Sequence, residues 1–435
     1  MRVNGVFRTV LVVLLVHVLC LHLASPSYAD DAAVLPKGVF RATMDSNVYF
    51  PVDKRYNPDG KVEDAAIDFN RNLNSSVFSA LAPLNAFVAG GSASIGTSVV
   101  SFEYDFTILE MGFQYGVTDS LTVGIRIPYW WVKNNVKARV DTSSANVGKN
   151  VAANSLRPLT VAGTVPLTTD DVQNLLGGGL DINGDGTVDI AGFGFKRIKT
   201  WSGDGVSDIE AGFRYQYLKT EDWRLAFTGG ARFPTGRVDD INNLVDYQFG
   251  SGAYALLFRL NNDFVISNLW RGTQKSAAEG GLVPAPGDLV LNGTFRYDLV
   301  LPDNEAKRVP GGANNPITTN KEKVSRNLGD LFEFEASGKY GLLEGLNFSA
   351  LYKHGFKLKD RVYGKKGFTY WALEEETKTS EDIYIIGLSY STLPLYIEKK
   401  FPFPLNASIS YRNRFAGSNN YLRSQFISAG LQIFF

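Results

Sequence analysis

A nine-residue stretch from Asp181 to Asp189 carries the residue types whose spacing points most directly to chemistry. Its oxygen-bearing side chains stand at positions one, three, five and nine: Asp181, Asn183, Asp185 and Asp189. A glycine at position six allows a sharp turn, and the backbone carbonyl of Thr187 at position seven supplies one more oxygen. Oxygen ligands in this order wrap a hard cation. The spacing therefore predicts a Ca²⁺ site with a structural role, which would stiffen a long loop over residues 141–205.

This stretch resembles the calcium loops of EF-hand, dockerin and integrin-type repeats. It departs from the EF-hand at position twelve, where Gly192 stands in place of the bidentate glutamate. The alternative is a solvated turn, rich in Asp, Asn and Gly, that binds no metal. The residues leave both interpretations open.

Catalytic chemistry has few residues to use. His354 is the only histidine after residue 29, and it alternates in phase with Phe348, Ala350 and Tyr352. A Ser–His pair like that of an outer-membrane phospholipase would depend on this one histidine. A strand histidine that faces outward near a membrane surface is the simpler interpretation. We expect no catalytic residues, no cofactor-binding residues and no enzyme activity.

The end of the chain shows most clearly which elements must position these residues. Apolar side chains share one face of this segment: Ile427, Ala429, Leu431, Ile433 and Phe435. Small or polar residues share the other face: Ser428, Gly430 and Gln432. A period of two predicts a strand, and these two faces fit lipid outside and water inside. A last strand that ends in an aromatic residue also resembles the C-terminal signature of bacterial outer-membrane barrels.

The same alternation recurs along the chain. With the last segment, it predicts thirteen strands, the others over residues 40–45, 100–115, 121–127, 209–217, 223–228, 250–260, 264–271, 289–297, 332–340, 346–356, 383–390 and 405–415. The phase slips near Leu109, which predicts a bulge. Because both termini of a barrel should lie on the periplasmic side, the strand number should be even. We prefer fourteen, with the missing strand in 303–328, and keep twelve and sixteen as alternatives.

Charged residues recur on the face opposite the apolar one. They are of both signs: Arg126, Asp208, Glu210, Arg214, Arg224, Arg232, Arg296, Glu333, Glu335, Lys339, Lys353 and Arg412. This pattern predicts a hydrated wall in which most of these groups are ion-paired. As the lining of a pore, a wall of mixed sign would select only weakly between cations and anions.

Aromatic residues and connection lengths favour a membrane barrel over a secreted sandwich. Aromatic residues near strand ends fit the girdles of a barrel: Tyr49, Phe50, Tyr129, Trp130, Trp131, Tyr215, Tyr217, Trp223, Trp270 and Tyr297. Short turns at 116–120, 219–222, 261–263 and 341–345 alternate with long segments at 51–96, 141–205, 235–249, 272–286, 303–327 and 360–380. Short periplasmic turns and long external loops are typical of outer-membrane barrels. The segment 51–96 fits a loop, a short helix or an inward-folded constriction.

Composition narrows the class of protein. The chain of 435 residues has 44 basic and 44 acidic residues, so it shows no basic excess for binding nucleic acid. Arg2 and Arg8, an apolar run and the sequence Ser27-Tyr28-Ala29 predict a signal peptide over residues 1–29. The single cysteine, Cys20, lies in this leader, which excludes disulfides and c-type haem from the mature chain. No later apolar run is long enough for a membrane helix.

Two hairpins resemble a known family. The run Gly205-Val-Ser-Asp-Ile-Glu-Ala-Gly-Phe-Arg-Tyr215, followed by Ala231-Arg-Phe-Pro-Thr-Gly236, is similar to the outer-membrane family named after meta-pathway phenol degradation. The hairpin Gly116–Gly124 fits as well, so the resemblance covers about residues 100–260 and the last strand. That family is related in style to the long-chain fatty-acid transporter barrels, although no counterpart of their N-terminal plug is evident. The resemblance implies a channel for small, often hydrophobic compounds.

The sequence thus predicts an all-β protein in which residues 30–435 form one antiparallel transmembrane barrel of the bacterial outer membrane. We expect outer-membrane lipid and a small-molecule solute as its partners, and a function in passive passage of small, possibly hydrophobic, solutes. The alternative is a structural or docking barrel, a sleeve for an electron carrier or another envelope protein.

Overall fold

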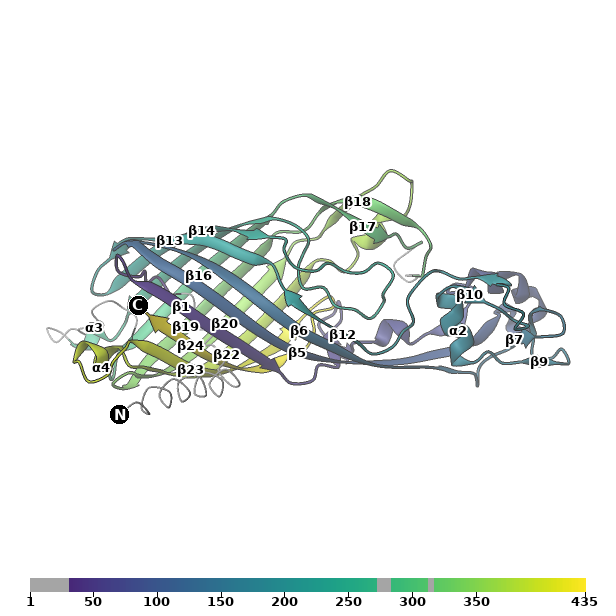
Figure 1. The fold of residues 1–435 in the computed structure, drawn as a ribbon, viewed down its shortest axis with the longest axis horizontal. Coiled ribbons are helices and arrows are strands. Elements are labelled where there is room, and N and C mark those ends of the chain that lie inside the picture. Colours follow the sequence, from purple (N-terminus) through teal and green to yellow (C-terminus); the bar gives the residue numbers. More distant parts are fainter. Residues whose placement is uncertain (1–30, 272–282, 312–316) are drawn as a thin grey trace, which may run out of the picture.

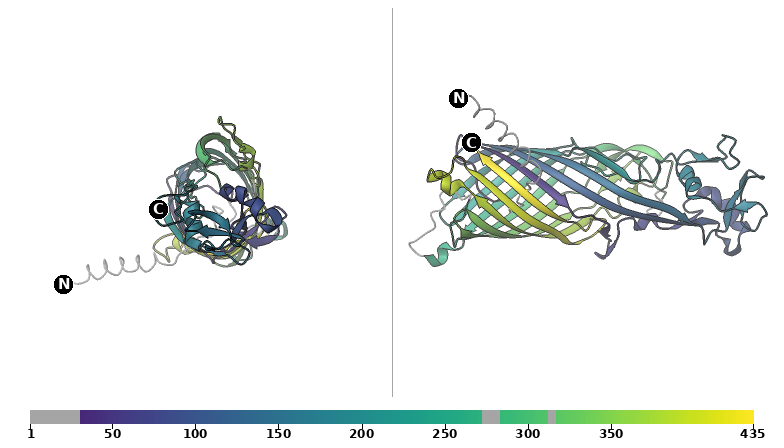
Figure 2. Two further views of the ribbon diagram at one scale, coloured as in Figure 1. Left: turned by 90° about the vertical axis from the view of Figure 1, so that its right-hand side faces the viewer. Right: turned by 60° about the horizontal axis from the view of Figure 1, so that its bottom comes forward.

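Twelve antiparallel strands close into a barrel in the computed structural model, which describes residues 31–271, 283–311 and 317–435 (Figure 1). Viewed along its axis, the barrel forms a ring (Figure 2). Its strands are β1 (Phe40–Tyr49), β5 (Ser94–Thr118), β6 (Leu121–Asp141), β13 (Ile209–Lys219), β14 (Trp223–Phe233), β15 (Ala255–Val265), β16 (Leu289–Val300), β19 (Leu331–Leu343), β20 (Leu346–Lys357), β22 (Thr379–Ser391), β23 (Leu405–Gly417) and β24 (Gln425–Phe434). The predicted signal peptide 1–29, with Cys20, lies outside the described residues.

The barrel closes through its first strand, because β1 pairs with β24 on one side and β5 on the other. The predicted all-β antiparallel barrel with an even strand number is therefore confirmed. The ring has twelve strands, the lower end of the predicted range of twelve to sixteen, and the whole sheet has the preferred number of fourteen. Two further strands extend the sheet without entering the ring, β12 (Trp201–Val206) beside β6 and β4 (Asn72–Asn74) beside β5.

One predicted turn is part of a strand. Residues Asn261-Asn262-Asp263 lie inside β15, where Asn261 and Asp263 face inward and are almost fully buried. Asn and Asp are typical of turns, but they fit this strand because its inner face is polar. The predicted strand 264–271 is consequently wrong, since the chain there leaves the barrel and forms the short helix α3 (Asn268–Arg271).

The predicted missing strand at 303–328 is also outside the barrel. This region forms β17 (Asp303–Arg308) and β18 (Lys321–Asn327), which pair with each other and with β21 (Arg361–Tyr363) in a separate sheet. Val309, Val324 and Val362 form its core, against which η4 (Tyr370–Leu373) is placed. The sheet therefore belongs to the loops at the barrel rim.

The β5–β6 hairpin is about twice as long as the other barrel hairpins, with strands of 25 and 21 residues. At about 3.3 Å per residue, β5 extends far beyond the roughly ten residues that cross a membrane. Its pairing runs through Leu109 without a shift, so the predicted bulge there is wrong. The face of β5 that carries the apolar side chains changes instead. Within the barrel wall Phe113 points outward, whereas beyond the rim Phe102 and Phe106 point inward. The phase slip marks the point where the strand leaves the barrel.

An external lobe, residues 72–96 and 142–198, caps this long hairpin and projects past the barrel (Figure 1). Its elements are η2 (Ser79–Phe87), η3 (Ala89–Gly91), β7 (Val147–Asn150), β8 (Ser155–Pro158), β9 (Thr164–Val165), α2 (Thr169–Leu176), β10 (Gly179–Leu180) and β11 (Ile190–Ala191). Below it lie β2 (Lys54–Tyr56), β3 (Val62–Asp64) and η1 (Ile67–Phe69). Thr168 is the N-cap residue of α2 and forms a capping box with Asp171, in which each side chain accepts a hydrogen bond from the backbone N–H of the other residue. The segment 51–96 therefore contains short helices and strands of the external region.

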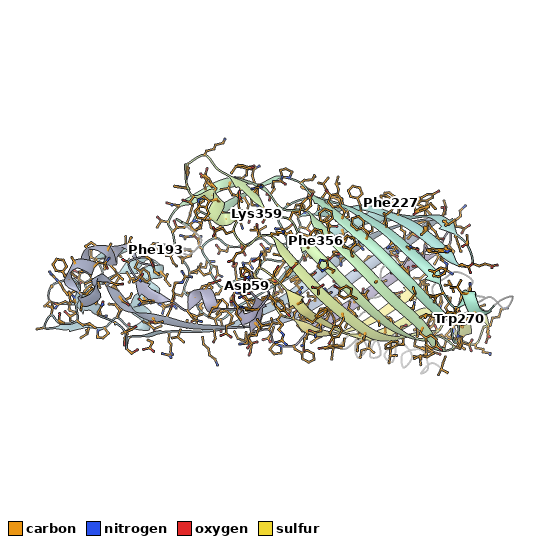
Figure 3. The ribbon with its side chains drawn as sticks, turned by 180° about the vertical axis from the view of Figure 1, so that it is seen from behind. Asp59, Phe193, Phe227, Trp270, Phe356 and Lys359 are labelled. Atoms are coloured by element: carbon orange, nitrogen blue, oxygen red, sulfur yellow. The ribbon has the colours of Figure 1, made fainter. Side chains whose placement is uncertain are left out.

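The opposite end carries the short turns. The β15–β16 connection also starts and ends there, because Val265 N–H donates to Asp222 and Gly287 N–H donates to Gly341. The prediction of an external loop is thus wrong for residues 283–286, and the rest of the predicted segment, 272–282, lies outside the described residues. Helix α4 (Leu393–Ile397) lies in the connection between β22 and β23 at this end. Figure 3 labels Trp270 at this end and Phe193 in the lobe at the other. In the described part of the chain, no helix has the length and apolarity needed to cross a membrane.

Candidate functional site: the barrel lumen

The outer face of the barrel is apolar and aromatic. Phe213, Phe334 and Ile409 are about half exposed on it. The predicted alternation of the last strand is confirmed, because Ile427 and Phe435 are exposed whereas Ser428 and Gly430 are buried. A closed ring leaves no unpaired strand edge, and an apolar exterior suits contact with acyl chains.

Most of the predicted girdle aromatics are exposed, but two face inward. Trp131, Tyr215, Tyr217 and Trp223 lie on the outer surface. Tyr49 packs against Phe106 and Phe426, and Trp130 packs against Tyr247 and Phe249. Their prediction as girdle residues is wrong, because the alternating positions of Tyr49 and Trp130 belong to the inner face.

A continuous chain of ion pairs, here called the ion-pair belt, follows the inner wall. It consists of Glu110, Arg126, Glu210, Arg232, Arg259, Arg296, Asp298, Glu333, Lys353, Glu381 and Arg414. These residues come from ten of the twelve barrel strands. A wall of paired charges of both signs is therefore present, and six of the twelve residues predicted for it belong to this network: Arg126, Glu210, Arg232, Arg296, Glu333 and Lys353.

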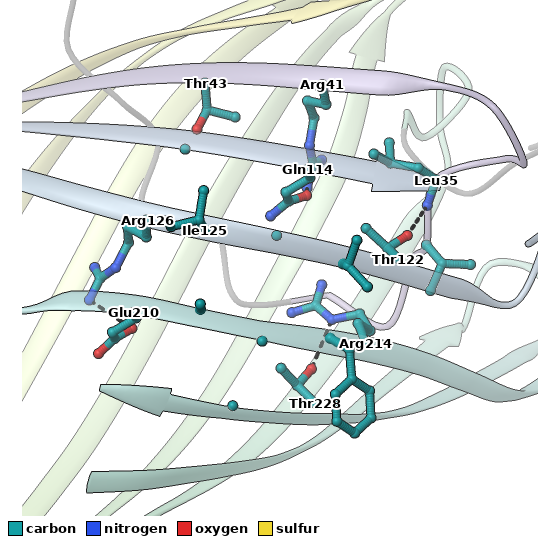
Figure 4. Close-up of a pocket in the computed structure, with 18 of the residues that line it drawn as sticks. Leu35, Arg41, Thr43, Gln114, Thr122, Ile125, Arg126, Glu210, Arg214 and Thr228 are labelled. Carbon is teal, nitrogen blue, oxygen red and sulfur yellow. Dashed lines mark hydrogen bonds and ion pairs between the residues drawn. The ribbon is translucent and has the colours of Figure 1, made fainter. Parts of the chain in front are cut away.

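Glu210 is the centre of the belt. Its carboxylate lies 3.0 Å from the guanidinium groups of Arg126 and Arg232, and 3.5 Å and 3.8 Å from those of Arg296 and Arg259. Figure 4 shows the Arg126–Glu210 pair inside the barrel. Only 7% of Glu210 is exposed, so four cations replace much of the water that an ionised carboxylate requires.

No residue of the ion-pair belt lies on β1 or β24. On that side β1 directs Arg41 and Asp45 into the lumen, whereas β23 and β24 present small residues, with Ser408 paired to Gly430 and Ser410 to Ser428. The hydroxyls of Ser408 and Ser410 make no hydrogen bond to the described protein. Since polar groups require partners, this side of the lumen is suited to water.

Two cavities meet at the belt. One of about 760 Å³ lies on the external side, and one of about 300 Å³ lies on the periplasmic side. Glu110, Arg126 and Glu210 line both cavities. The belt therefore stands between two spaces within one barrel.

A loop over residues 234–254, here called the inward loop, covers the external cavity. Val245 and Phe249 are almost fully buried, and the Asn134 amide donates to the Val245 carbonyl at 3.0 Å. Burial raises the pKa of Tyr247 in this loop to about 12. The segment 51–96, for which an inward-folded constriction was one expectation, contributes Val52 and Ala66 to the packing of this loop.

The motif Gly205–Tyr215 with Ala231–Gly236 fixes the inward loop. The Asp208 carboxylate accepts from Gly236 N–H at 3.0 Å and Ser251 N–H at 2.8 Å, and Thr235 donates its hydroxyl to Ser207. A Cβ on Gly236 would lie 2.7 Å from the Gly250 backbone, so this close approach requires glycine. The motif that carries the family resemblance therefore has a structural role at the lumen entrance.

Residues 31–36, here called the N-terminal plug, occupy the periplasmic end of the lumen. Ala32 N–H donates to the Asp263 carboxylate at 3.1 Å, and Gln216 donates to the Ala32 carbonyl at 2.8 Å. Leu35 is 1% exposed, and its N–H donates to Thr122, as Figure 4 shows. Sequence reasoning missed this plug because a six-residue extended segment has no periodicity to detect.

The predicted calcium loop closes the β10–β11 hairpin of the external lobe. Asp181 accepts from Gly184 and Gly186 N–H groups at 2.7 and 2.8 Å, while Asp189 accepts from Ile182 N–H at 2.8 Å. Asn183 and Thr187 hydrogen-bond to Asp185 in the same turn, and these bonds lower the pKa of Asp185. Asp181, Asp185 and Asp189 do not converge, and no other group of three or more His, Cys, Asp or Glu in the described residues could hold a metal. The donor types fit Ca²⁺, but binding would require these carboxylates to turn inward.

His354 lies on the outer face, as predicted. Its Nδ1 is 2.8 Å from the Asp382 carboxylate, which also accepts from the Tyr352 hydroxyl at 2.6 Å. These contacts give the histidine a structural environment on the barrel surface.

Arg308 ties three external segments together. Its guanidinium donates to the carbonyls of Phe193, Gly194, Ile241 and Thr318 and to the Asn242 side chain, at 2.6 to 2.8 Å. Burial lowers its pKa. One side chain thus links the lobe, the inward loop and the separate rim sheet.

These features define a transmembrane β-barrel of the outer-membrane type, with a partly filled lumen. No protein-family model and no curated protein sequence matches the chain. Its fold is similar to that of the COG4313 outer membrane channel from Pseudomonas putida F1, at 11% identity and TM-score 0.46 over 94% of this chain and 100% of that one. It is also similar to the CymD monoaromatic hydrocarbon channel, at 10% identity and TM-score 0.33 over 92% and 89% of the two chains. A Pseudomonas aeruginosa FadL homologue matches at 11% identity and TM-score 0.30 over 93% and 90%. All three are outer-membrane barrels; the phenol-degradation family stays a prediction.

Proposed function

We propose that this protein is a passive channel for small solutes in the bacterial outer membrane, without enzyme activity. The observation that carries the proposal is the pair of cavities, about 760 Å³ and 300 Å³, that share the belt residues Glu110, Arg126 and Glu210. A solute would enter past the inward loop, cross the belt beside the small residues of β23 and β24, and leave past the N-terminal plug.

The contents of the lumen favour a channel over a sleeve for an envelope protein. A sleeve needs an open bore that admits a segment of its partner, whereas the inward loop and the plug occupy part of the lumen at the two ends of this barrel. Solutes of a few ångströms are what the remaining cavities can hold.

Two measurements on the purified mature protein test the proposal. Planar bilayers should show discrete conductance steps, and liposomes that contain the protein should swell in small sugars. A barrel that inserts but shows neither conductance nor swelling, and that copurifies with one envelope protein, would instead support the sleeve.

We also propose that the Asp181–Asp189 loop binds Ca²⁺ and stiffens the external lobe. Support comes from its oxygen donors and its position at the tip of the β10–β11 hairpin. Calorimetric titration with calcium should give a heat of binding, and Asp185→Ala should abolish it. The control Asp59→Ala, in another exposed turn in which the Asp59 N–H donates to the Asn57 side chain, should leave the heat unchanged. Absence of heat from the unaltered protein would reject the site.

A further inference from the structure

A third cavity, of about 260 Å³, lies outside the lumen between the long hairpin and the external lobe. Here it is called the lobe cavity. Its walls are largely apolar: Phe69, Leu73, Val77, Phe78, Val100, Val140, Val172, Leu176, Ile198, Leu244 and Ile317. They come from the inner face of β5 and β6, from α2 and from neighbouring loops. The described residues thus line a largely apolar space, open on one side, between the hairpin and the lobe.

Three of the polar side chains on its wall are already bound to protein. The Gln173 side chain donates to the Ile198 carbonyl at 3.1 Å and accepts from the Ile198 N–H at 2.9 Å. Ser98 donates to the Phe69 carbonyl at 2.5 Å, and Arg71 Nε donates to the Asp68 carbonyl at 2.8 Å. These groups hold the wall in place, so a ligand gains most from burying apolar surface there.

The size and chemistry of the lobe cavity define its ligand. An apolar cavity of about 150 Å³ accepts one benzene molecule and stays free of water, and this space is larger. We propose that the lobe cavity is a binding site for an uncharged aromatic hydrocarbon of one or two rings. The proposal rests on the channel function, because it makes the site a place of capture beside the channel entrance.

The inward loop connects the two sites. Leu244 lines the lobe cavity, whereas Tyr247 and Phe249, a few residues further on, line the external cavity of the lumen. The buried Val245 between them is held by Asn134 of β6. A ligand that leaves the lobe cavity along this loop meets the aromatic cluster of Trp130, Tyr247 and Phe249. Aromatic side chains line the space on both sides of the loop.

Iodobenzene locates the site directly. Crystals of the mature protein soaked in iodobenzene should show iodine anomalous density among Val172, Leu176 and Leu244. Density confined to the lumen or to the lipid-facing surface, or no density, would overturn the proposal without any variant.

Equilibrium dialysis tests the site in solution. Detergent micelles dissolve naphthalene by themselves, so the informative quantity is the difference between proteins in the same detergent. Wild-type protein should bind one more naphthalene per chain than Val172→Phe, which fills the cavity. The control Val161→Phe, at an exposed position of the same lobe, should bind like wild type. Equal binding by wild type and Val172→Phe would reject the site. Val172→Phe should conduct like wild type. If both proteins conduct but bind equal amounts of naphthalene, the lobe cavity is rejected while the channel function stands.

Discussion

Replacement of Glu210 by glutamine tests whether ions cross the ion-pair belt. The belt has five carboxylates and six cations, so its members carry one net positive charge. Glu210→Gln raises this to two and removes the carboxylate that pairs with Arg126 and Arg232, while keeping the side-chain size. The lumen should become more selective for anions.

The size of the effect follows from Coulomb's law. A unit charge 4 Å from a permeating ion contributes about 1 kcal/mol even in a water-like medium. Loss of the charge disfavours potassium by this amount and favours chloride by the same amount, so the ratio of their permeabilities changes by about 2 kcal/mol. Because 1.4 kcal/mol corresponds to a factor of ten, the ratio of chloride to potassium permeability should rise about 25-fold. The reversal potential of a single channel in a KCl gradient measures this ratio.

Two variants complete the test. Glu344→Gln removes a carboxylate from an exposed turn outside the lumen and should leave the reversal potential unchanged. Arg126→Gln should shift it toward cations. Since removing one partner of a buried ion pair costs about 3–5 kcal/mol, Glu210→Gln should also unfold at a lower temperature in the heat-dependent gel shift of the barrel. An unchanged reversal potential in conducting Glu210→Gln channels would refute a path through the belt.

Three further predictions concern the other parts of the lumen and its cover. Deletion of residues 31–35 should raise single-channel conductance, because the N-terminal plug leaves the periplasmic cavity; equal conductance would show that the plug does not limit flow. Arg308→Met should speed hydrogen exchange at Phe193–Phe195 and Ile241–Asn242, since each lost charged hydrogen bond is worth about 1.5–3 kcal/mol; Arg361→Met, on an exposed side chain, serves as the control. Burial raises the pKa of Asp171, but bonds from Lys149 and Thr168 outweigh it and lower that pKa below the ordinary value. Its stabilisation of α2 should therefore be complete above about pH 3.9 and be lost as pH falls through the lowered value. The protease resistance of the lobe should exceed that of Asp171→Asn at pH 7, with a gap that narrows in acid; a gap that widens in acid would contradict this sign.

The period-two alternation predicted the barrel because each strand has a different solvent on each side. It succeeded for β24, where Ile427 meets lipid and Ser428 meets the lumen. It failed for Asn261 and Asp263, since a polar inner face permits residues that usually form turns. It also failed near Leu109, where the surroundings of both faces change at the barrel rim while the backbone continues unchanged.

The lumen was predicted only as a set of charges. Their inward direction follows from alternation, but their order around the ring depends on the register of ten strands, which a single sequence does not reveal. The N-terminal plug depends on still longer connections, because Ala32 and its acceptor Asp263 are 231 positions apart. The inward loop was identified as a long segment, but its direction depends on the Asp208 and Asn134 contacts.

The position of β1 between β24 and β5 has a consequence for biogenesis. The ring stays open along one edge until β24 pairs with β1, so its closure requires both ends of the barrel sequence. Residues 31–36 lie a few positions before β1 and inside the finished ring. One short stretch of chain therefore supplies both a side of the seam and part of the contents of the lumen.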